Sequence, residues 1–301
     1  MEILSGLLNG VTSRPYVFVF LALHLALCIC HLGLHRALLF TVLGYVVALV
    51  CEASSIHNGF PFGLYYYRPE AFHGELTVAG VPYWDSLSFA YLTYFSYTIA
   101  LFLYSPHYRI PGDFQLLETK DLRRAPRVLV TAALFMAMID AIIDPVTLQG
   151  GKWFLGPIYF YPDGGVHFGV PISNYLGWFF VGLTILVLYT VVDILYLPKA
   201  TGGEKGCRRI PYGGLWGGLV YLGVVGFILA VTLYVGDYQL ATASSLVYVL
   251  PLAMAVALLW RREKPTPAQV AQYLDDFPDS ALARSDLADG PYAIQNRQKP
   301  S

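Results

Sequence analysis

The sequence contains few charged residues for its length. Asp, Glu, Lys and Arg make up 13% of the 301 residues, hydrophobic residues make up 56%, and the mean hydropathy is +0.54. A soluble globular protein carries about 25% charged residues. The composition therefore excludes an ordinary soluble globule and indicates an integral membrane protein. The formal net charge of −1 also offers no basic surface for a nucleic acid.

Sequence patterns that bind metals or cofactors are missing as well. The four cysteines form no CxxC pair, and no glycine-rich stretch matches a phosphate-binding loop or a dinucleotide fingerprint. His31 and His35 have the i, i+4 spacing of metal ligands, but they fall at a turn away from the acidic residues described below. The histidine clusters of a di-iron membrane hydroxylase and the helix-seven lysine of a retinal protein are not in the sequence. We therefore expect no metal and no other cofactor.

Seven apolar runs are long enough to cross about 30 Å of hydrocarbon. The sequence therefore predicts an all-α polytopic membrane protein with seven transmembrane helices. Residues 1–262 are expected to form the helical membrane domain, and the polar residues 263–301 a mostly disordered tail. The seven runs lie near 15–33, 36–54, 84–104, 126–144, 173–197, 213–235 and 239–260.

Lysine and arginine are distributed unequally between the two sides of the predicted bundle. With seven helices, the polar connectors 105–125 and 198–212 and the tail fall on one side and carry most of the basic residues. The other side has only Arg14, Arg68 and Lys152. The positive-inside rule therefore places the C-terminus in the cytoplasm and the N-terminus outside the cell membrane.

Two carboxylates in an apolar helix form the central motif. The predicted helix 126–144 carries Asp140 and Asp144, and Pro145 follows. Residues four apart lie on the same helix face, so both acids are expected to point the same way. A proline disfavours the helical conformation of the residue before it, so we expect the helix to end at Asp144. Ionisable residues are costly inside a membrane, and such a pair indicates a functional site.

A weak internal repeat relates this motif to an earlier part of the chain. Helix 36–54 ends in Glu52, which is followed by a Gly/Tyr-rich loop at 59–67 and by Gly-Val-Pro at 80–82. The same order recurs after Asp140, with a Gly/Tyr-rich loop at 156–162 and Gly-Val-Pro at 169–171. Both units cross the membrane in the same direction, which places both loops on one side. The two units can therefore share a site between them.

At these residues the sequence resembles the integral-membrane carotenoid hydratases, which act on γ-carotene-type carotenoids or on bisanhydrobacterioruberin. The resemblance covers roughly residues 40–260. Its pattern is an acid at the end of the second helix, then G-x-P-F-G-x-Y-x-Y, G-V-P, D-x-x-x-D-P and G-V-P-x-x-N-x-x-G-W. In this chain these motifs are Glu52 and the segments 59–67, 80–82, 140–145 and 169–178.

The resemblance implies a hydro-lyase of carotenoid biosynthesis. Such an enzyme adds water across the terminal C1=C2 double bond of an acyclic ψ end group and gives a tertiary alcohol. The reaction needs an acid that protonates an alkene, and two neighbouring carboxyls away from water suit that need because they share a proton. We expect Asp144 to deliver the proton and Asp140 to act as its neighbour, with Glu52 as a third catalytic residue.

The resemblance also implies a substrate and a set of contacts. The expected partners are a polyene carotenoid and the lipid bilayer, with other enzymes of the carotenoid pathway as further candidates. Aromatic faces stabilise cations, and an asparagine can orient water or an acid. The expected substrate-binding residues are Asn174, Trp178, Tyr65, Tyr67, Tyr161 and His167.

The sequence leaves other interpretations open. The acids could cap loop amides or pair with Lys152 or Arg68, and tyrosines are enriched at membrane interfaces whatever the function. A carotenoid end-group cyclase begins with the same protonation and then closes a ring. A non-enzymatic carrier of an isoprenoid or an ion can also have paired intramembrane acids and repeats.

The unequal distribution of Lys and Arg generates a test of the orientation. A reporter fused after Arg262 is expected to be cytoplasmic, and one inserted in the loop 145–170 is expected to be external. The reverse result would contradict the orientation and place the acids at the cytoplasmic face.

Overall fold

Seven helices of the computed structural model are long and apolar enough to cross a membrane. The structure describes residues 2–72, 74–110, 112–152, 156–196, 210–260, 265–280 and 282–283. The prediction of an all-α polytopic membrane protein is confirmed, and each predicted run corresponds to one of these helices. They are α2 (Pro15–Leu32), α3 (Leu34–Asn58), α4 (Tyr83–Tyr104), α6 (Pro126–Thr147), α7 (Ile172–Tyr196), α8 (Gly213–Val235) and α9 (Tyr238–Trp260).

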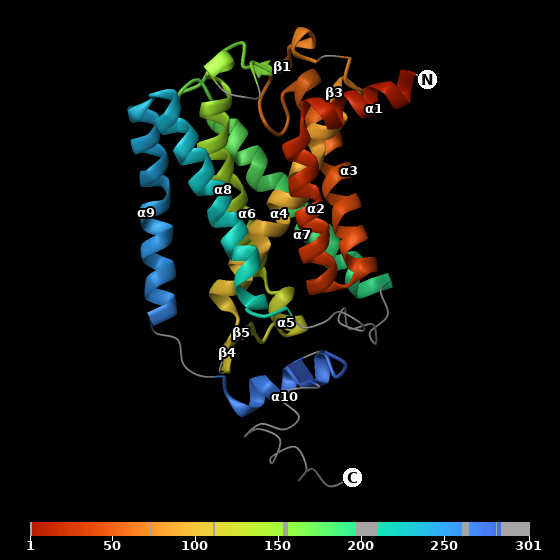
Figure 1. Ribbon diagram of the computed structural model, residues 1–301, viewed down its shortest axis with the longest axis vertical. Coiled ribbons are helices and arrows are strands. Elements are labelled where there is room, and N and C mark those ends of the chain that lie inside the picture. Colours follow the sequence, from red (N-terminus) through yellow and green to blue (C-terminus); the bar gives the residue numbers. More distant parts are fainter. Residues whose placement is uncertain are drawn as a thin grey trace.

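The short elements gather at the two ends of this bundle (Figure 1). We call the end with the two Gly/Tyr-rich loops the loop end, and the opposite end the connector end. The loop end contains α1 (Glu2–Ser13), β1 (Tyr66–Tyr67), η1 (Pro69–Ala71), β2 (Thr77–Val78), β3 (Val81–Pro82), η2 (Gly150–Lys152) and β6 (Tyr159–Phe160). The connector end contains β4 (His107–Ile110), β5 (Asp113–Leu116), α5 (Lys120–Arg123) and α10 (Pro267–Asp276). The basic connector residues 198–209 and residues 261–264 lie outside the described residues.

Helix α4 occupies the centre of the bundle. It packs against α2, α3, α6 and α8, and most of its residues are buried. Close helix approach depends on small residues. A Cβ atom added at Gly44 of α3 would lie 2.7 Å from the Cα of Ala90 on α4. Helix α4 is therefore held where its first turns can contribute side chains to the interior of the bundle.

The two repeat units pack in corresponding ways. Helix α3 packs on α4 as α6 packs on α7, and the units cross-pack through α3 with α7 and α4 with α6. Their loops are joined at the loop end, where β1 and β6 pair antiparallel with Tyr66 opposite Phe160. Phe89 and Trp178, which each follow the glycine of their Gly-Val-Pro by nine residues, stack with ring centroids 4.2 Å apart. The units thus meet about an approximate two-fold axis.

The prediction that Pro145 ends its helix is wrong. Helix α6 continues through Pro145 to Thr147. A proline removes one backbone donor and crowds the carbonyl four residues before it. The chain tolerates this here because only two residues of the helix remain. Asp140 and Asp144 therefore lie one full turn apart on regular helix.

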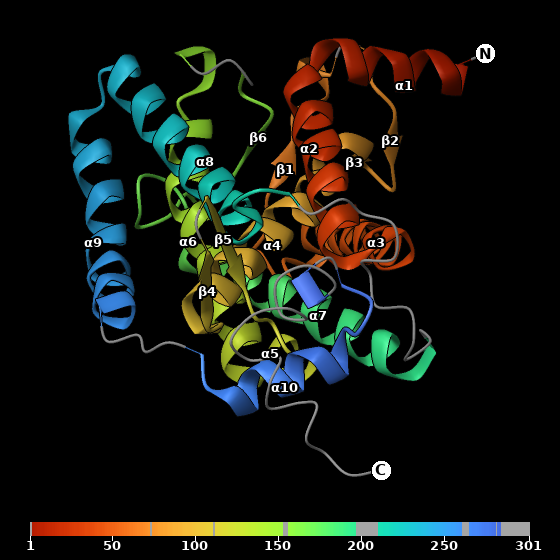
Figure 2. The same ribbon diagram turned by 60° about the horizontal axis from the view of Figure 1, so that its bottom comes forward.

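Helices α1 and α10 were not expected from hydropathy. Helix α1 is too short to span a membrane, and it lies across the loop end, with Gly6 against Leu76 of the loop and Gly10 against Tyr83 at the start of α4. Helix α10 forms within the tail that was expected to be disordered, and it lies under the connector end beside α5 (Figure 2). Thr266 and Gln269 form a capping box at its start. Residues 284–301 lie outside the described residues.

Packing explains why α10 forms in a polar tail. Its Val270 and Tyr273, with the following Phe277, are buried in a small cluster with Tyr108 and Leu117. The Asp276 carboxylate also accepts a hydrogen bond from the backbone N–H of Lys120, at 2.7 Å.

Truncation of Tyr273 is expected to release α10. The change Tyr273→Ala removes a buried aromatic side chain, and such changes cost about 3–5 kcal/mol. We expect faster proteolysis between residues 265 and 280 with unchanged unfolding of the membrane bundle. Asp275→Ala, at an exposed position of the same helix, is the control. Equal proteolysis of both variants and the parent protein would show that the cluster does not hold this helix.

Candidate active site

The second repeat unit brings two carboxyls and an amide together. Asp140 and Asp144 of α6 are 1% and 6% exposed, and Asn174 of α7 is 2% exposed. The Asn174 side-chain amide donates to Asp140 Oδ2 at 2.6 Å and to Asp144 Oδ2 at 2.8 Å. Asn174 lies in the first turn of α7, which directly follows Gly-Val-Pro. The start of α7 therefore supplies the donor that joins the two acids.

The loop between α6 and α7 adds two further donors to this pair. Tyr161 donates to Asp144 Oδ2 at 2.8 Å, and Tyr159 donates to Asp144 Oδ1. Burial and the nearby Asp144 raise the pKa of both tyrosines well above the usual value, so both hydroxyls remain protonated donors. Asp144 thus accepts three hydrogen bonds, whereas Asp140 Oδ1 is buried without a hydrogen-bond partner among the described residues.

The first repeat unit contributes a second pair of carboxyls. Glu52 of α3 is buried and accepts hydrogen bonds from Ser86 and from Tyr67, the latter at 3.3 Å. The Tyr67 hydroxyl lies closer to Asp85 Oδ2 of α4, at 2.6 Å. Burial raises the pKa of Tyr67 well above the usual value, so this residue also acts as a donor. One tyrosine hydroxyl therefore links two acids on neighbouring helices.

Asp85 and Ser86 were not predicted as site residues. The internal repeat does point to Asp85, because its position in the first unit is equivalent to that of Asn174 in the second. Asp85 is the fifth residue after Gly80, and Asn174 is the fifth residue after Gly169. Equivalent positions in the two units therefore carry an acid and its amide counterpart. Ser86 has no such counterpart, since Tyr175 follows Asn174 and points to His167 instead.

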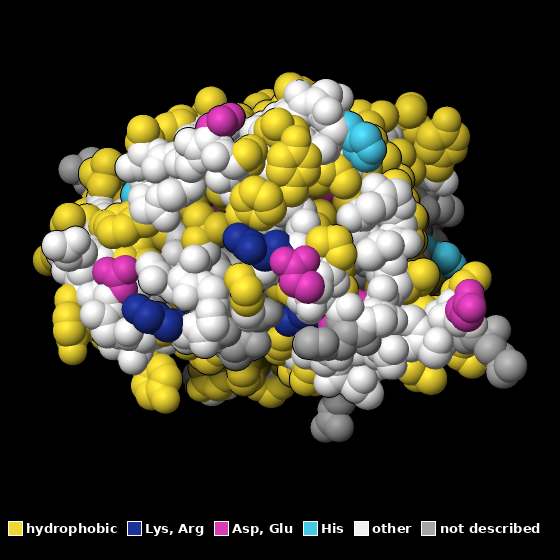
Figure 3. All heavy atoms as spheres, turned by 90° about the horizontal axis from the view of Figure 1, so that it is seen from above, with side chains coloured by type: hydrophobic (Ala, Val, Ile, Leu, Met, Phe, Trp, Pro, Cys, Tyr) yellow, Lys and Arg dark blue, Asp and Glu magenta, His cyan; other side chains and the backbone are white. Residues whose placement is uncertain are grey.

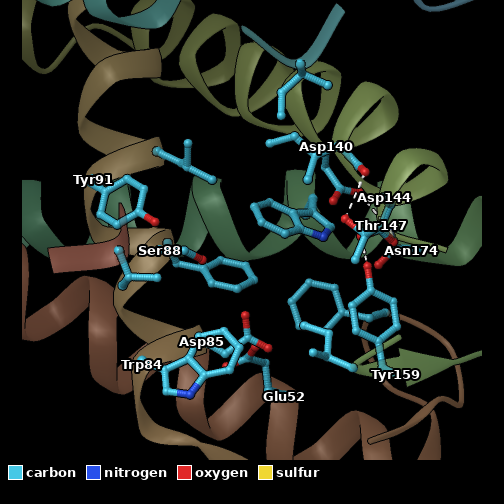
Figure 4. Close-up of a pocket in the computed structure, with 18 of the residues that line it drawn as sticks. Glu52, Trp84, Asp85, Ser88, Tyr91, Asp140, Asp144, Thr147, Tyr159 and Asn174 are labelled. Carbon is cyan, nitrogen blue, oxygen red and sulfur yellow. Dashed lines mark hydrogen bonds between the residues drawn. The ribbon is translucent and has the colours of Figure 1, made fainter. Parts of the chain in front are cut away.

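Both pairs line one cavity of about 160 Å³, which we call the acid pocket. Figure 4 shows Glu52 and Asp85 on one side of it and Asp140 and Asp144 on another, with aromatic rings between them. The stacked rings of Phe89 and Trp178 belong to this lining. The pocket therefore combines apolar aromatic walls with two groups of acids.

The structure brings together eight of the nine residues predicted for the site. These are Asp144, Asp140, Glu52, Asn174, Trp178, Tyr65, Tyr67 and Tyr161, all of which line the acid pocket. His167 is not among the lining residues. Its Nδ1 lies 2.6 Å from the Tyr175 hydroxyl in the loop before α7, and burial lowers its pKa. The prediction that His167 contacts the substrate is not supported by its position.

The acids are held by neutral donors. Among the described residues, no ion pair joins Glu52, Asp140 or Asp144 to Lys152, Arg68 or any other cation. Figure 3, which views the loop end, shows charged side chains only as scattered groups among hydrophobic and uncharged atoms. The described residues also contain no group of three or more His, Cys, Asp or Glu side chains suited to a metal ion. The acid pocket is lined by carboxyl groups, an amide, hydroxyls and aromatic rings.

Seven apolar helices around the acid pocket define a polytopic membrane protein with buried carboxyl groups between its helices. A family model described as carotenoid biosynthesis protein matches residues 13–251. The chain therefore belongs to this family, and its function lies in carotenoid biosynthesis. The apolar helices and the family fit a carotenoid substrate in a lipid membrane. No curated protein and no solved structure matches the chain.

Proposed function

We propose that this protein is a hydro-lyase that adds water to the terminal C1=C2 double bond of an acyclic carotenoid end group. The observation that carries the proposal is that two groups of carboxyls, buried at Glu52, Asp140 and Asp144 and half-buried at Asp85, face one aromatic pocket. Hydration of an isolated alkene needs a proton donor, a surface that stabilises a tertiary cation, and an acceptor for the proton that water loses. The acid pocket offers a candidate for each.

The hydrogen bonds favour Asp140 as the proton donor, which reverses the roles expected from the sequence. Three donors surround Asp144 and stabilise its ionised form. Among the described residues, Asp140 accepts from Asn174 alone, and no group donates to its Oδ1. A proton on this oxygen turns an acceptor without a donor into an O–H donor, which can point at an alkene carbon in the pocket. Asp144 then acts as the ionised neighbour that holds Asn174 and Asp140 in place.

The cation and the water can be placed on the remaining groups. Transfer of the Asp140 proton to C2 leaves a tertiary cation at C1, which the faces of Phe89, Trp178 and Tyr65 can stabilise. A water oxygen then bonds to C1 and the oxonium loses a proton to the carboxyl pair Glu52 and Asp85. Solvent exchange returns a proton to Asp140 and completes the cycle. No oxidant and no cofactor enters this sequence of steps.

The origin of the new oxygen and hydrogen tests the reaction class. Product made in H₂¹⁸O by the purified protein is expected to carry the heavy oxygen at C1, and product made in D₂O to carry deuterium at C2. Both reactions should proceed without air. A ring-closed product without added oxygen would instead identify a cyclase, and label from ¹⁸O₂ would contradict acid catalysis. Absence of any conversion would favour a carrier.

Two variants separate proton donation from water capture. Asp140→Asn is expected to lower hydration by about 10²–10⁴-fold, the usual contribution of a general acid, and to abolish deuterium uptake into recovered substrate. Asp85→Asn is expected to lower hydration while deuterium still enters the substrate, because the cation forms with deuterium at C2 and then loses a protium to give back a labelled alkene. Asp144→Asn should affect hydration less than Asp140→Asn.

Asp163→Asn is the matched control for these variants, since Asp163 is an exposed carboxylate at the loop end. It should retain full activity, and thermal unfolding should show that each variant folds. Equal losses of hydration and of deuterium uptake in the Asp140 and Asp85 variants would contradict the division of roles.

A further inference from the structure

A second cavity lies at the connector end of the same bundle. It has a volume of about 130 Å³ and is lined by residues of α2, α4, β5, α5, α8 and the segment around α10. We call it the connector cavity. Its polar lining includes His31, Glu118 and Arg123, with His31 Nε2 2.6 Å and Arg123 Nε 3.1 Å from the Glu118 carboxylate. The acid mechanism uses none of these residues.

On each helix that they share, residues of one face contribute to the lining of both the connector cavity and the acid pocket. On α4 the lining residues Trp84, Ser88, Tyr91 and Thr98 are four, three and seven residues apart, which is the spacing of a single helix face. The same holds for α2 and α8, where the spacings are four, seven and four. The residues are Tyr16, Phe20, Leu27 and His31 on α2, and Gly213, Gly217, Val224 and Ile228 on α8.

These faces form a seam along α4. Helices α2 and α8 both pack on α4, and Figure 1 shows α4 between them. On the α8 side, Phe227 borders the acid pocket and Trp216 borders the connector cavity, and these side chains are 48% and 44% exposed. Each cavity therefore has an apolar, partly exposed side chain of α8 at its edge, on the outer surface of the bundle.

We propose that the seam binds the whole length of a linear polyene, with one end in the acid pocket and the far end in the connector cavity. The identity of the end in the acid pocket rests on the proposed function. A rigid conjugated chain cannot fold back inside the acid pocket, so its remainder needs an apolar path. The part of α4 from Asp85 to Thr98 supplies about 20 Å of such a path, at about 1.5 Å per residue.

The chemistry of the connector cavity indicates which far end it prefers. Burial alone would raise the pKa of Glu118, but His31 and Arg123 lower it to about 2. The negative charge of Glu118 is thus balanced by neighbouring side chains of the lining, so the cavity does not require an ionic ligand. The Thr98 hydroxyl donates to the Phe95 carbonyl, and the Gln115 amide nitrogen donates to Asp113 and to the Ile210 carbonyl, so the side-chain oxygens of Thr98 and Gln115 are the neutral acceptors of this lining. These groups suit a neutral, oxygenated end group, such as an end that already carries a hydroxyl.

A blocking substitution tests the seam through substrate length. Leu27→Trp should fill the connector cavity and lower turnover of a full-length acyclic carotenoid at least about ten-fold, equivalent to about 1.4 kcal/mol. Turnover of a short acyclic terpene with the same end group should be unchanged, since it does not reach Leu27. That activity also shows that the variant folds. Ala26→Trp, at an exposed neighbouring position, is the control. An equal effect on both substrates, or no effect of Leu27→Trp on the long one, would overturn the proposal.

A labelling experiment tests the same seam without turnover. Cys30 lines the connector cavity, Cys51 of α3 does not, and neither forms a disulfide. Bound full-length carotenoid is expected to slow N-ethylmaleimide labelling of Cys30, measured on its peptide by mass spectrometry, and to leave Cys51 unchanged. Protection without any hydration would support the seam and refute the hydratase. Hydration without protection of Cys30 would refute the seam and leave the hydratase intact.

Discussion

The site depends on keeping several carboxyl groups inside an apolar bundle without a direct ion pair to any of them among the described residues. Removing a charged group from water is expensive, and the usual compensation is a nearby cation or a set of hydrogen bonds. Here the described residues supply only neutral donors, namely Tyr67, Tyr159, Tyr161, Ser86 and Asn174. A carboxyl stabilised in this way is not neutralised by a fixed charge, and its proton can take part in chemistry. The folding of both loops back over the helix ends follows from the same need for donors.

The approximate two-fold arrangement explains how a single pocket can hold two different groups of acids. Duplicate units place equivalent positions opposite each other, and the paired strands β1 and β6 fix their tyrosines on the two sides. The two units differ at positions that line the acid pocket. Asp85 in one unit corresponds to Asn174 in the other, and only the second unit has two acids on one helix. Opposite walls of the pocket thus carry different polar groups at equivalent positions.

Much of the fold followed from the sequence because hydropathy and helix length dominate in a membrane. All seven spans were located in this way. The nine site residues were predicted from the acid motif and the family resemblance instead, and eight of them line the acid pocket. Features that depend on tertiary packing were not predicted from the sequence. Helix α10 packs against Tyr108 and Leu117, which lie in a connector far away in the sequence. The sequence pattern of the tail itself does not predict this contact. Pro145 was interpreted by its usual local effect, whereas its position close to the end of α6 removes most of the cost. Asp85 lies in a helix rich in aromatic residues and was not predicted as a site residue. The sequence signal for it is its position in the repeat, which is equivalent to that of Asn174.

Both groups of acids lie at the same end of the bundle, next to the paired loops. Under the proposed reaction, the proton that is consumed and the proton that is released are therefore exchanged with the same compartment. No net charge crosses the bilayer during a turnover. The reaction would then neither draw on nor dissipate the proton gradient, and its rate would respond to the acidity of one compartment while being indifferent to the transmembrane voltage.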